Sequence, residues 1–152
     1  MKNDIRYVHT NIIARDWRKL VDFYVAVFDC EALPPERNLS GQWVDQLTTL
    51  SNATIRGMHL RLPGCDAGTT LEIFSYEPEE ESGAFGAVNR CGLGHLAFQV
   101  DSVEDVLANL LEHGGSQLGA LVKKDYGELG VLTVVYARDP EGNIVELQNW
   151  QR

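Results

Sequence analysis

A histidine in a short β-prone segment and a glutamate in a later one occur together twice in this chain. The first half holds His9 and Glu72, and the second half holds His95 and Glu146, with a helical segment between the members of each pair. Imidazole nitrogen and carboxylate oxygen suit Ni, Zn, Fe, Mn or Co, and affinity alone does not choose among these metals. The repeated pair predicts one divalent transition-metal site with His9, Glu72, His95 and Glu146 as ligands.

The positions of the four candidates along their strands support this prediction. Residues two apart on a strand share a face. Three of the four candidates have small or polar neighbours on their own face and an apolar opposite face; around Glu146, for example, Val145 and Leu147 point the other way. A single strand histidine or glutamate is more often structural or solvent-facing than a ligand. The equivalence of the two halves is what favours a cleft-lining metal site.

Hydrophobic spacing predicts an α+β fold of two βαβββ modules, over about residues 5–77 and 93–150, within one domain of 152 residues. In the first module we expect strands over 7–13, 43–50, 55–62 and 70–76, a helix over 17–28, and an irregular start to 29–42. In the second we expect strands over 93–100, 116–122, 129–137 and 143–149 and a helix over 102–113. Residues 78–91 read as a linker. Each module should contribute a curved sheet to a cleft.

Several local signals set the ends of these elements. Asp16, and either Asp101 or Ser102, are suitable N-caps for the two helices. Gly114 follows the second helix, where glycine tolerates a left-handed conformation. Residues 139–143, Asp-Pro-Glu-Gly-Asn, form a strong turn signal before the last strand.

Two other histidines and several aromatic residues stand outside the four-ligand set. His59 has no counterpart in the second half, so it is either structural or a partner of a ligand. His113 closes a helix, where an imidazolium complements the helix dipole. Some aromatic residues could line an apolar pocket, although such spacings are more typical of core. They are Trp43, Phe74, Tyr76, Tyr126 and Trp150.

Composition excludes several classes of function. The net charge of -9 argues against binding to nucleic acid or to an anionic membrane surface, both of which require basic patches. No segment approaches the ~20 apolar residues that a membrane span needs. Three cysteines without a CxxC spacing predict reduced thiols in a cytoplasmic protein.

Three stretches resemble the vicinal oxygen chelate superfamily, which includes glyoxalase I, methylmalonyl-CoA epimerase, extradiol dioxygenases and fosfomycin or bleomycin resistance proteins. They are His9 with Asp16 and Phe23-Tyr24, residues 94–101, and residues 139–147. The resemblance covers nearly the whole chain. It implies a small-molecule substrate, a homodimer, and metal ligands at the four positions as in bacterial glyoxalase I. It also implies that Glu146 is the proton-transfer base and that Glu72 can contribute to proton shuttling.

The chain also departs from glyoxalase I. Ile13 and Cys91 stand where that family carries arginines, with Arg90 one place earlier. Both departures weaken the case for a glutathione thioester substrate without affecting the metal site. The resemblance therefore implies a metal-dependent lyase or isomerase that moves a proton next to a carbonyl.

Three alternatives remain. Methylmalonyl-CoA epimerase usually has glutamine where Glu72 stands. Extradiol dioxygenases use two histidines and one glutamate around Fe(II), so a fourth ligand disfavours that reading. The alternative from a different class is a non-catalytic ligand-binding or resistance protein that uses the same cleft.

Overall fold

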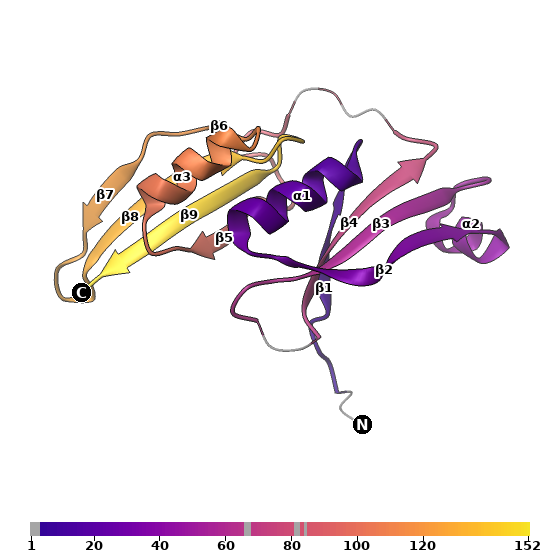
Figure 1. The fold of residues 1–152 in the computed structure, drawn as a ribbon, viewed down its shortest axis with the longest axis horizontal. Helices are drawn as coiled ribbons and strands as arrows, with labels where there is room; N and C mark the ends of the chain where they lie inside the picture. Colours follow the sequence, from indigo (N-terminus) through magenta and orange to yellow (C-terminus); the bar gives the residue numbers. More distant parts are fainter. Residues whose placement is uncertain (1–3, 66–67, 81–82, 84) are drawn as a thin grey trace. The chain divides into compact units, whose positions relative to one another are not determined.

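The chain divides into two compact units, Met1–Glu81 and Ser82–Arg152 (Figure 1). The computed structural model describes residues 4–65, 68–80, 83 and 85–152. Each unit is one sheet with a helix packed on it, as the predicted α+β fold requires. Among the described residues, no helix is both long enough and apolar enough to cross a membrane.

The sheet of the first unit has the strand order β1-β4-β3-β2. Its strands are β1 (His9–Ile13), β2 (Glu31–Ser40), β3 (Thr54–Arg61) and β4 (Thr70–Glu77). β1 runs parallel to β4, and the other neighbours are antiparallel. The irregular start expected over 29–42 is present only as a register shift inside β2, between Leu33 and Arg37. β2 pairs with β3 there and places Pro34 and Pro35 at a register shift on the sheet edge, where a missing N–H is tolerated.

Helix α1 (Trp17–Phe28) covers one face of this sheet, against β2, β3 and β4. It begins where the sequence predicts, because the Asp16 carboxylate accepts a hydrogen bond from the Lys19 backbone N–H at 3.2 Å. Its buried residues include Leu20 and Tyr24, which fall at helical spacing. Apolar residues of β3 and β4 are buried on the same side, so α1 and the sheet form the core of this unit.

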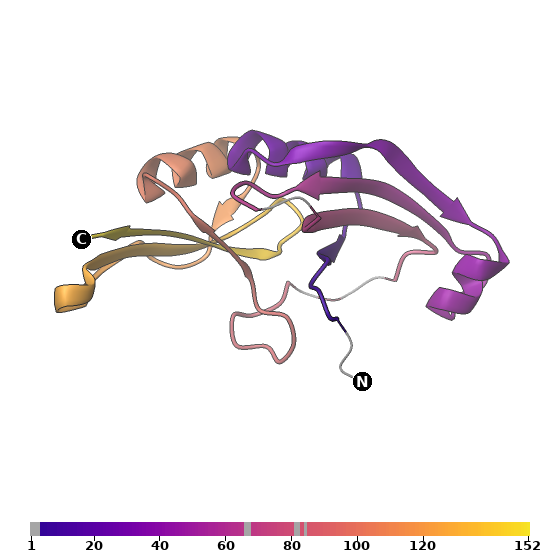
Figure 2. The same cartoon turned by 90° about the horizontal axis from the view of Figure 1, so that it is seen from below.

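A second, short helix, α2 (Gln42–Thr48), replaces the strand expected over 43–50. The Asp45 carboxylate accepts hydrogen bonds from the backbone N–H groups of Asn52 and Ala53, at 2.8 and 2.9 Å, and so closes the turn after the helix. Val44 is buried with Ala53, Ile55 and Phe74. Figure 2 shows α1 and α2 on opposite faces of the sheet. The face of the sheet opposite α1 is therefore partly covered by α2.

The sheet of the second unit has the order β5-β9-β8-β6, with β7 also paired to β8. Its strands are β5 (Leu96–Gln99), β6 (Ser116–Gln117), β7 (Val122–Asp125), β8 (Val131–Arg138) and β9 (Ile144–Gln151). The single strand expected over 116–122 is wrong: two short strands, β6 and β7, lie along one edge of β8. A 3-10 turn, η1 (Gly127–Leu129), joins β7 to β8. Because β5 runs parallel to β9, the topology repeats that of the first unit.

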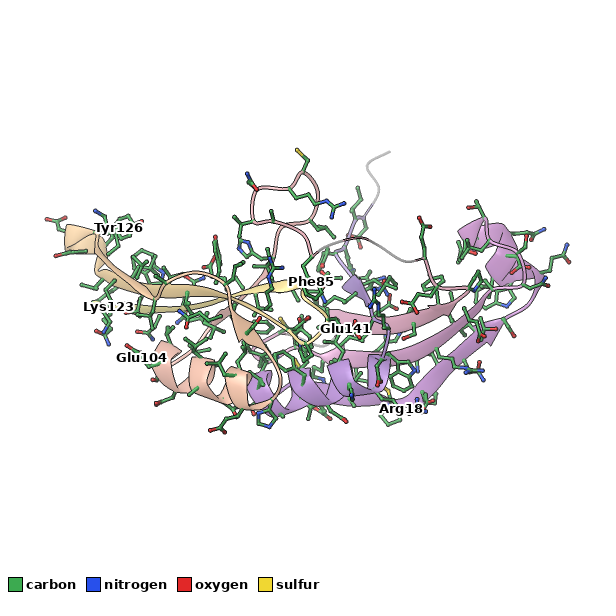
Figure 3. All side chains as sticks on the ribbon, turned by 90° about the horizontal axis from the view of Figure 1, so that it is seen from above. Arg18, Phe85, Glu104, Lys123, Tyr126 and Glu141 are labelled. Carbon is green, nitrogen blue, oxygen red and sulfur yellow. The ribbon has the colours of Figure 1, made fainter. Side chains whose placement is uncertain are left out.

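Helix α3 (Val103–Glu112) covers one face of the second sheet, against β6, β8 and β9. The Ser102 hydroxyl caps it by accepting a hydrogen bond from Asp105 N at 3.2 Å, and the ring of His113 closes it on the Asn109 carbonyl at 2.8 Å. Lys123 of β7 pairs with Glu104 of α3 at 3.4 Å (Figure 3). Lys123 therefore lies on the helix-covered side of β7.

Candidate metal centre

Glu72 lies at the middle of β4, between β1 and β3, and is only 8% exposed. Its Oε1 is 2.9 Å from Nε2 of His9, and its Oε2 is 2.9 Å from Nε2 of His59. Asn11, which faces Glu72 across the parallel pair, donates a long hydrogen bond to Oε1 at 3.5 Å. The structure therefore brings together the two candidate ligands of the first half and adds a second imidazole.

His59, which the sequence leaves as either structural or a partner of a ligand, is a direct partner of Glu72. It lies directly opposite Glu72 in the antiparallel β3–β4 pair. Burial lowers the pKa of His59, the charge of Glu72 opposes that effect, and Arg37 and His9 add to it. The imidazole is therefore neutral at pH 7, the form that can donate one hydrogen bond to a carboxylate. Because strand register is not readable from spacing, the sequence did not distinguish these two roles.

The second unit contains the equivalent pair. His95 immediately precedes β5, and its Nε2 is 3.1 Å from Oε2 of Glu146 on β9. Tyr136 on β8 faces Glu146 in the register, and its ring centre is 5.0 Å from that of His95. In the described part of the chain, Oε1 of Glu146 has no hydrogen-bond or ion-pair partner. Glu146 thus keeps one free carboxylate oxygen, whereas both oxygens of Glu72 are engaged.

The two pairs are equivalent in register as well as in residue type. Asn11 faces Glu72, and Ala97 faces Glu146, so each histidine comes two residues before the position opposite its glutamate. This alternation puts the histidine and the glutamate on one face of neighbouring parallel strands. Within each unit, the predicted partners therefore converge.

The spacing of the donor atoms fits a shared cation. Two ligands bound at about 2.1 Å and at right angles on one octahedral ion lie roughly 3 Å apart. The His9–Glu72 and His95–Glu146 contacts, at 2.9 and 3.1 Å, have this spacing. Within the described residues, no three or more His, Cys, Asp or Glu side chains are grouped as one metal cluster. Each unit thus provides one pair of donor atoms with the spacing of adjacent ligands.

The candidate pocket aromatics divide into three kinds. Phe74 is buried and Tyr76 is partly buried in the core closed by α2. Both are therefore core residues, the role more typical of their spacing. Trp43 is 54% exposed on α2. Tyr126 and Trp150 form an exposed ring pair in the second unit, with centres 5.4 Å apart. Of the five, this pair is therefore the one available to a ligand in contact with the sheet that carries Glu146.

A surface pocket of about 580 Å³ in the first unit lies at the start of α1 and contains none of the four candidate ligands. Two of its arginines are already paired, Arg15 with Glu79 at 3.2 Å and Arg18 with Glu36 at 2.6 Å. Arg18 also stacks on the ring of Trp17, at 4.2 Å from its centre. These pairings account for two of the three arginines that line the pocket, the third being Arg56.

Fold and site together define a protein of two repeated βαβββ-type modules, each with a histidine–glutamate pair on one face of its sheet. The family model described as the Glyoxalase/Bleomycin resistance protein/Dioxygenase superfamily matches residues 6–147. The chain belongs to this superfamily, as the resemblance of its motifs predicts. No curated protein matches it significantly.

Solved structures show the same fold. A glyoxalase family protein from Bacillus cereus aligns with a TM-score of 0.84 at 18% identity, covering 99% of this chain and 98% of that one. A glyoxalase family protein from Enterococcus faecalis is 26% identical, with a TM-score of 0.60 and coverage of 94% and 96%. The fosfomycin resistance protein FosX from Listeria monocytogenes, complexed with Mn(II) and sulfate, is 16% identical, with a TM-score of 0.53 and coverage of 99% and 95%.

Proposed function

We propose that this protein is a divalent-metal-dependent enzyme of the lyase or isomerase type, which moves a proton at a carbon next to a carbonyl. His9, Glu72, His95 and Glu146 would hold one transition-metal ion, with the two pairs supplied by one chain or by two copies in a homodimer. The observation that carries the proposal is the repeated histidine–glutamate contact at 2.9 and 3.1 Å. A bound divalent ion would polarise a carbonyl oxygen and stabilise the negative charge that develops on it.

The two glutamates differ in a way that supports Glu146 as the proton acceptor. Glu72 is nearly buried, and both of its oxygens contact imidazole nitrogens, from His9 and His59. Glu146 contacts one imidazole, that of His95, so its Oε1 is free to take a proton from a substrate carbon. A carboxylate with an open lone pair and one fixed oxygen is suited to general base catalysis. Glu72 is better suited to holding His9 in place.

The test compares the two glutamates by matched substitutions. Protein reconstituted with Ni, Co, Zn or Mn would be incubated in D₂O with a panel of α-hydroxycarbonyl and α-oxo compounds, and exchange at the carbon next to the carbonyl followed by NMR. Glutamine keeps an oxygen ligand of the same size and removes the basicity. Because a general base contributes about 10² to 10⁴ in rate, we expect Glu146→Gln to lose most of the exchange and keep much of its metal.

Glu72→Gln is the matched control and should be milder. Unchanged exchange in Glu146→Gln with loss in Glu72→Gln would reverse the two roles. Full exchange in both variants would show that neither carboxylate is the base. The absence of exchange on every compound, in protein that holds stoichiometric metal, would contradict this reaction class.

A second candidate function also has a specific observation behind it. Nitrogen–oxygen distances of 2.9 and 3.1 Å are also ordinary hydrogen-bond distances, so each pair can be satisfied by an imidazole N–H donating to the carboxylate. In that case the cleft would serve a non-catalytic ligand-binding or resistance protein. A purified chain that retains no stoichiometric transition metal, whichever ion is supplied, would favour this second function.

A further inference from the structure

The face of the second sheet that carries Glu146, here called the site face, has three rows of side chains. Strand register pairs Glu146 with Tyr136, then Gln148 with Val134, and then Trp150 with Leu132. These residues alternate with Thr133, Val135, Ala137, Val145 and Leu147, which are buried on the side of α3. The site face therefore passes from a carboxylate through an amide to an aromatic end, where β7 adds Lys124 opposite Leu132.

The outer row forms a preorganised aromatic surface. Tyr126 stacks against Trp150, with ring centres 5.4 Å apart and planes inclined by 43°. The indole N–H of Trp150 donates to Oε1 of Gln148 at 3.1 Å, which fixes the ring next to the middle row. Trp150 remains 38% exposed and Tyr126 48% exposed. Figure 3 shows Tyr126 at the end of the sheet, away from α3.

The opposite end of the site face is closed. The guanidinium of Arg138 donates to the carbonyl oxygens of Gly142 and Gly86 at 2.7 and 2.9 Å. The ring of Phe85 lies against Arg138, at 5.7 Å, and against Gly142, where it occupies the space that a Cβ would need. A molecule bound at Glu146 can therefore extend along the sheet in one direction, toward Trp150.

The first unit shows by contrast what is unusual here. There the rows beyond Glu72 are Phe74 with Gly57 and then Tyr76 with Ile55. α2 covers them, and Val44 is buried in that cluster. The first unit thus fills the equivalent surface with its own core, whereas in the described part of the second unit no helix covers it.

We propose that the substrate carries a flat apolar group, which binds on Trp150 and Tyr126, roughly 13 Å along β9 from Glu146 at about 3.3 Å per residue. This inference rests on the proposed function, because it assumes that the oxygen atoms at the other end of the substrate meet the metal site. The substrate class is then an elongated molecule with a carbonyl head and an aromatic or similarly flat tail. Stacking on a partly exposed indole favours such a tail.

The experiment uses 2-oxo acids with a terminal phenyl group on a chain of increasing length, from phenylglyoxylate to 2-oxo-6-phenylhexanoate. Binding to Co(II)-loaded protein of residues 1–152 is measured by calorimetry. Affinity should rise by about 10- to 100-fold from the shortest to the longest probe, since burying a ring and methylenes adds a few kcal/mol at most. Trp150→Ala should abolish this rise and Trp150→Phe should keep most of it. Trp43→Ala, which removes an exposed tryptophan of the first unit, should change nothing.

The outcomes separate this inference from the proposed function. Metal-dependent binding of all probes with no dependence on chain length would overturn the aromatic subsite and leave the metal site standing. EDTA treatment removes the metal, and 6-phenylhexanoate lacks the oxo group. If affinity still rises with chain length after EDTA treatment and 6-phenylhexanoate binds as well as the 2-oxo acid, the proposed function is contradicted instead. Dissociation of an oligomer by Trp150→Ala, with probe binding unchanged, would show that the surface contacts a second copy and would overturn the inference.

Discussion

His59 and Tyr136 occupy the same position in the two halves of this protein: each lies directly opposite the proposed metal-binding glutamate on the neighbouring antiparallel strand. His59 faces Glu72, and Tyr136 faces Glu146. The imidazole engages the second oxygen of Glu72, whereas in the described residues the free oxygen of Glu146 has no partner. The difference between His59 and Tyr136 therefore leaves both oxygens of Glu72 in contact with imidazoles and one oxygen of Glu146 open to a substrate.

His59→Phe should weaken metal binding without preventing it. His59 contacts Glu72 at 2.9 Å, and partners that orient a ligand typically contribute about 10- to 100-fold in metal affinity. Isothermal titration with Co(II) should show an affinity lower by that factor and an unchanged stoichiometry. His113→Ala, at the end of α3, is the control and should bind as the wild type does. Complete loss of metal in His59→Phe would make His59 a ligand itself, and unchanged affinity would remove its supporting role.

Thiol reactivity should distinguish one cysteine from the other two. Burial, with smaller contributions from Asp29 and Cys65, raises the pKa of Cys30 to about 12, whereas Cys65 and Cys91 are exposed. A disulfide reagent at pH 8 should therefore modify two thiols in the folded protein and the third after unfolding in guanidinium. Rapid modification of all three thiols in the folded state would contradict the burial of Cys30.

The same pKa sets a direction for alkaline stability. Folded Cys30 keeps its proton between its ordinary pKa of 9.0 and about 12, where the unfolded chain has lost it. The contribution of this thiol to the free energy of unfolding is complete below pH 9 and is lost as the pH rises toward 12. Urea unfolding of the wild type and Cys30→Ala at pH 8 and pH 10.5 should show a smaller loss in the variant. An equal loss in both proteins would assign the pH dependence to other groups.

Activity on the glutathione–methylglyoxal hemithioacetal should be weak or absent. Ile13, on β1, stands where glyoxalase I carries an arginine, and it is 51% exposed. An aliphatic side chain there offers no partner to a glutathione carboxylate. A spectrophotometric assay of metal-loaded protein should detect little product. Turnover in the usual enzymatic range of ~1 to 10³ per second would show that the missing arginine does not matter.

The elements around the proposed ligands were predictable because their signals are local. The α1 cap at Asp16 and the apolar spacing of Leu20 and Tyr24 mark the helix that the structure contains. α2 was mistaken for a strand because it is two turns long and Val44 is its one buried residue, so the sequence holds no helical period. The register-dependent features, His59 opposite Glu72 and Tyr136 opposite Glu146, depend on which strands pair, and spacing along one strand does not encode that.

Metal content tests the central claim most directly. The wild type and four single variants, His9→Ala, Glu72→Ala, His95→Ala and Glu146→Ala, would be loaded with Co(II), dialysed and measured by mass spectrometry, with circular dichroism to confirm folding. One shared site predicts about one ion per chain in the wild type and loss of stoichiometric metal in each variant, because removing a single ligand opens the shell. Wild-type protein without stoichiometric metal, or full metal retention in both His95→Ala and Glu146→Ala, would contradict the four-ligand site.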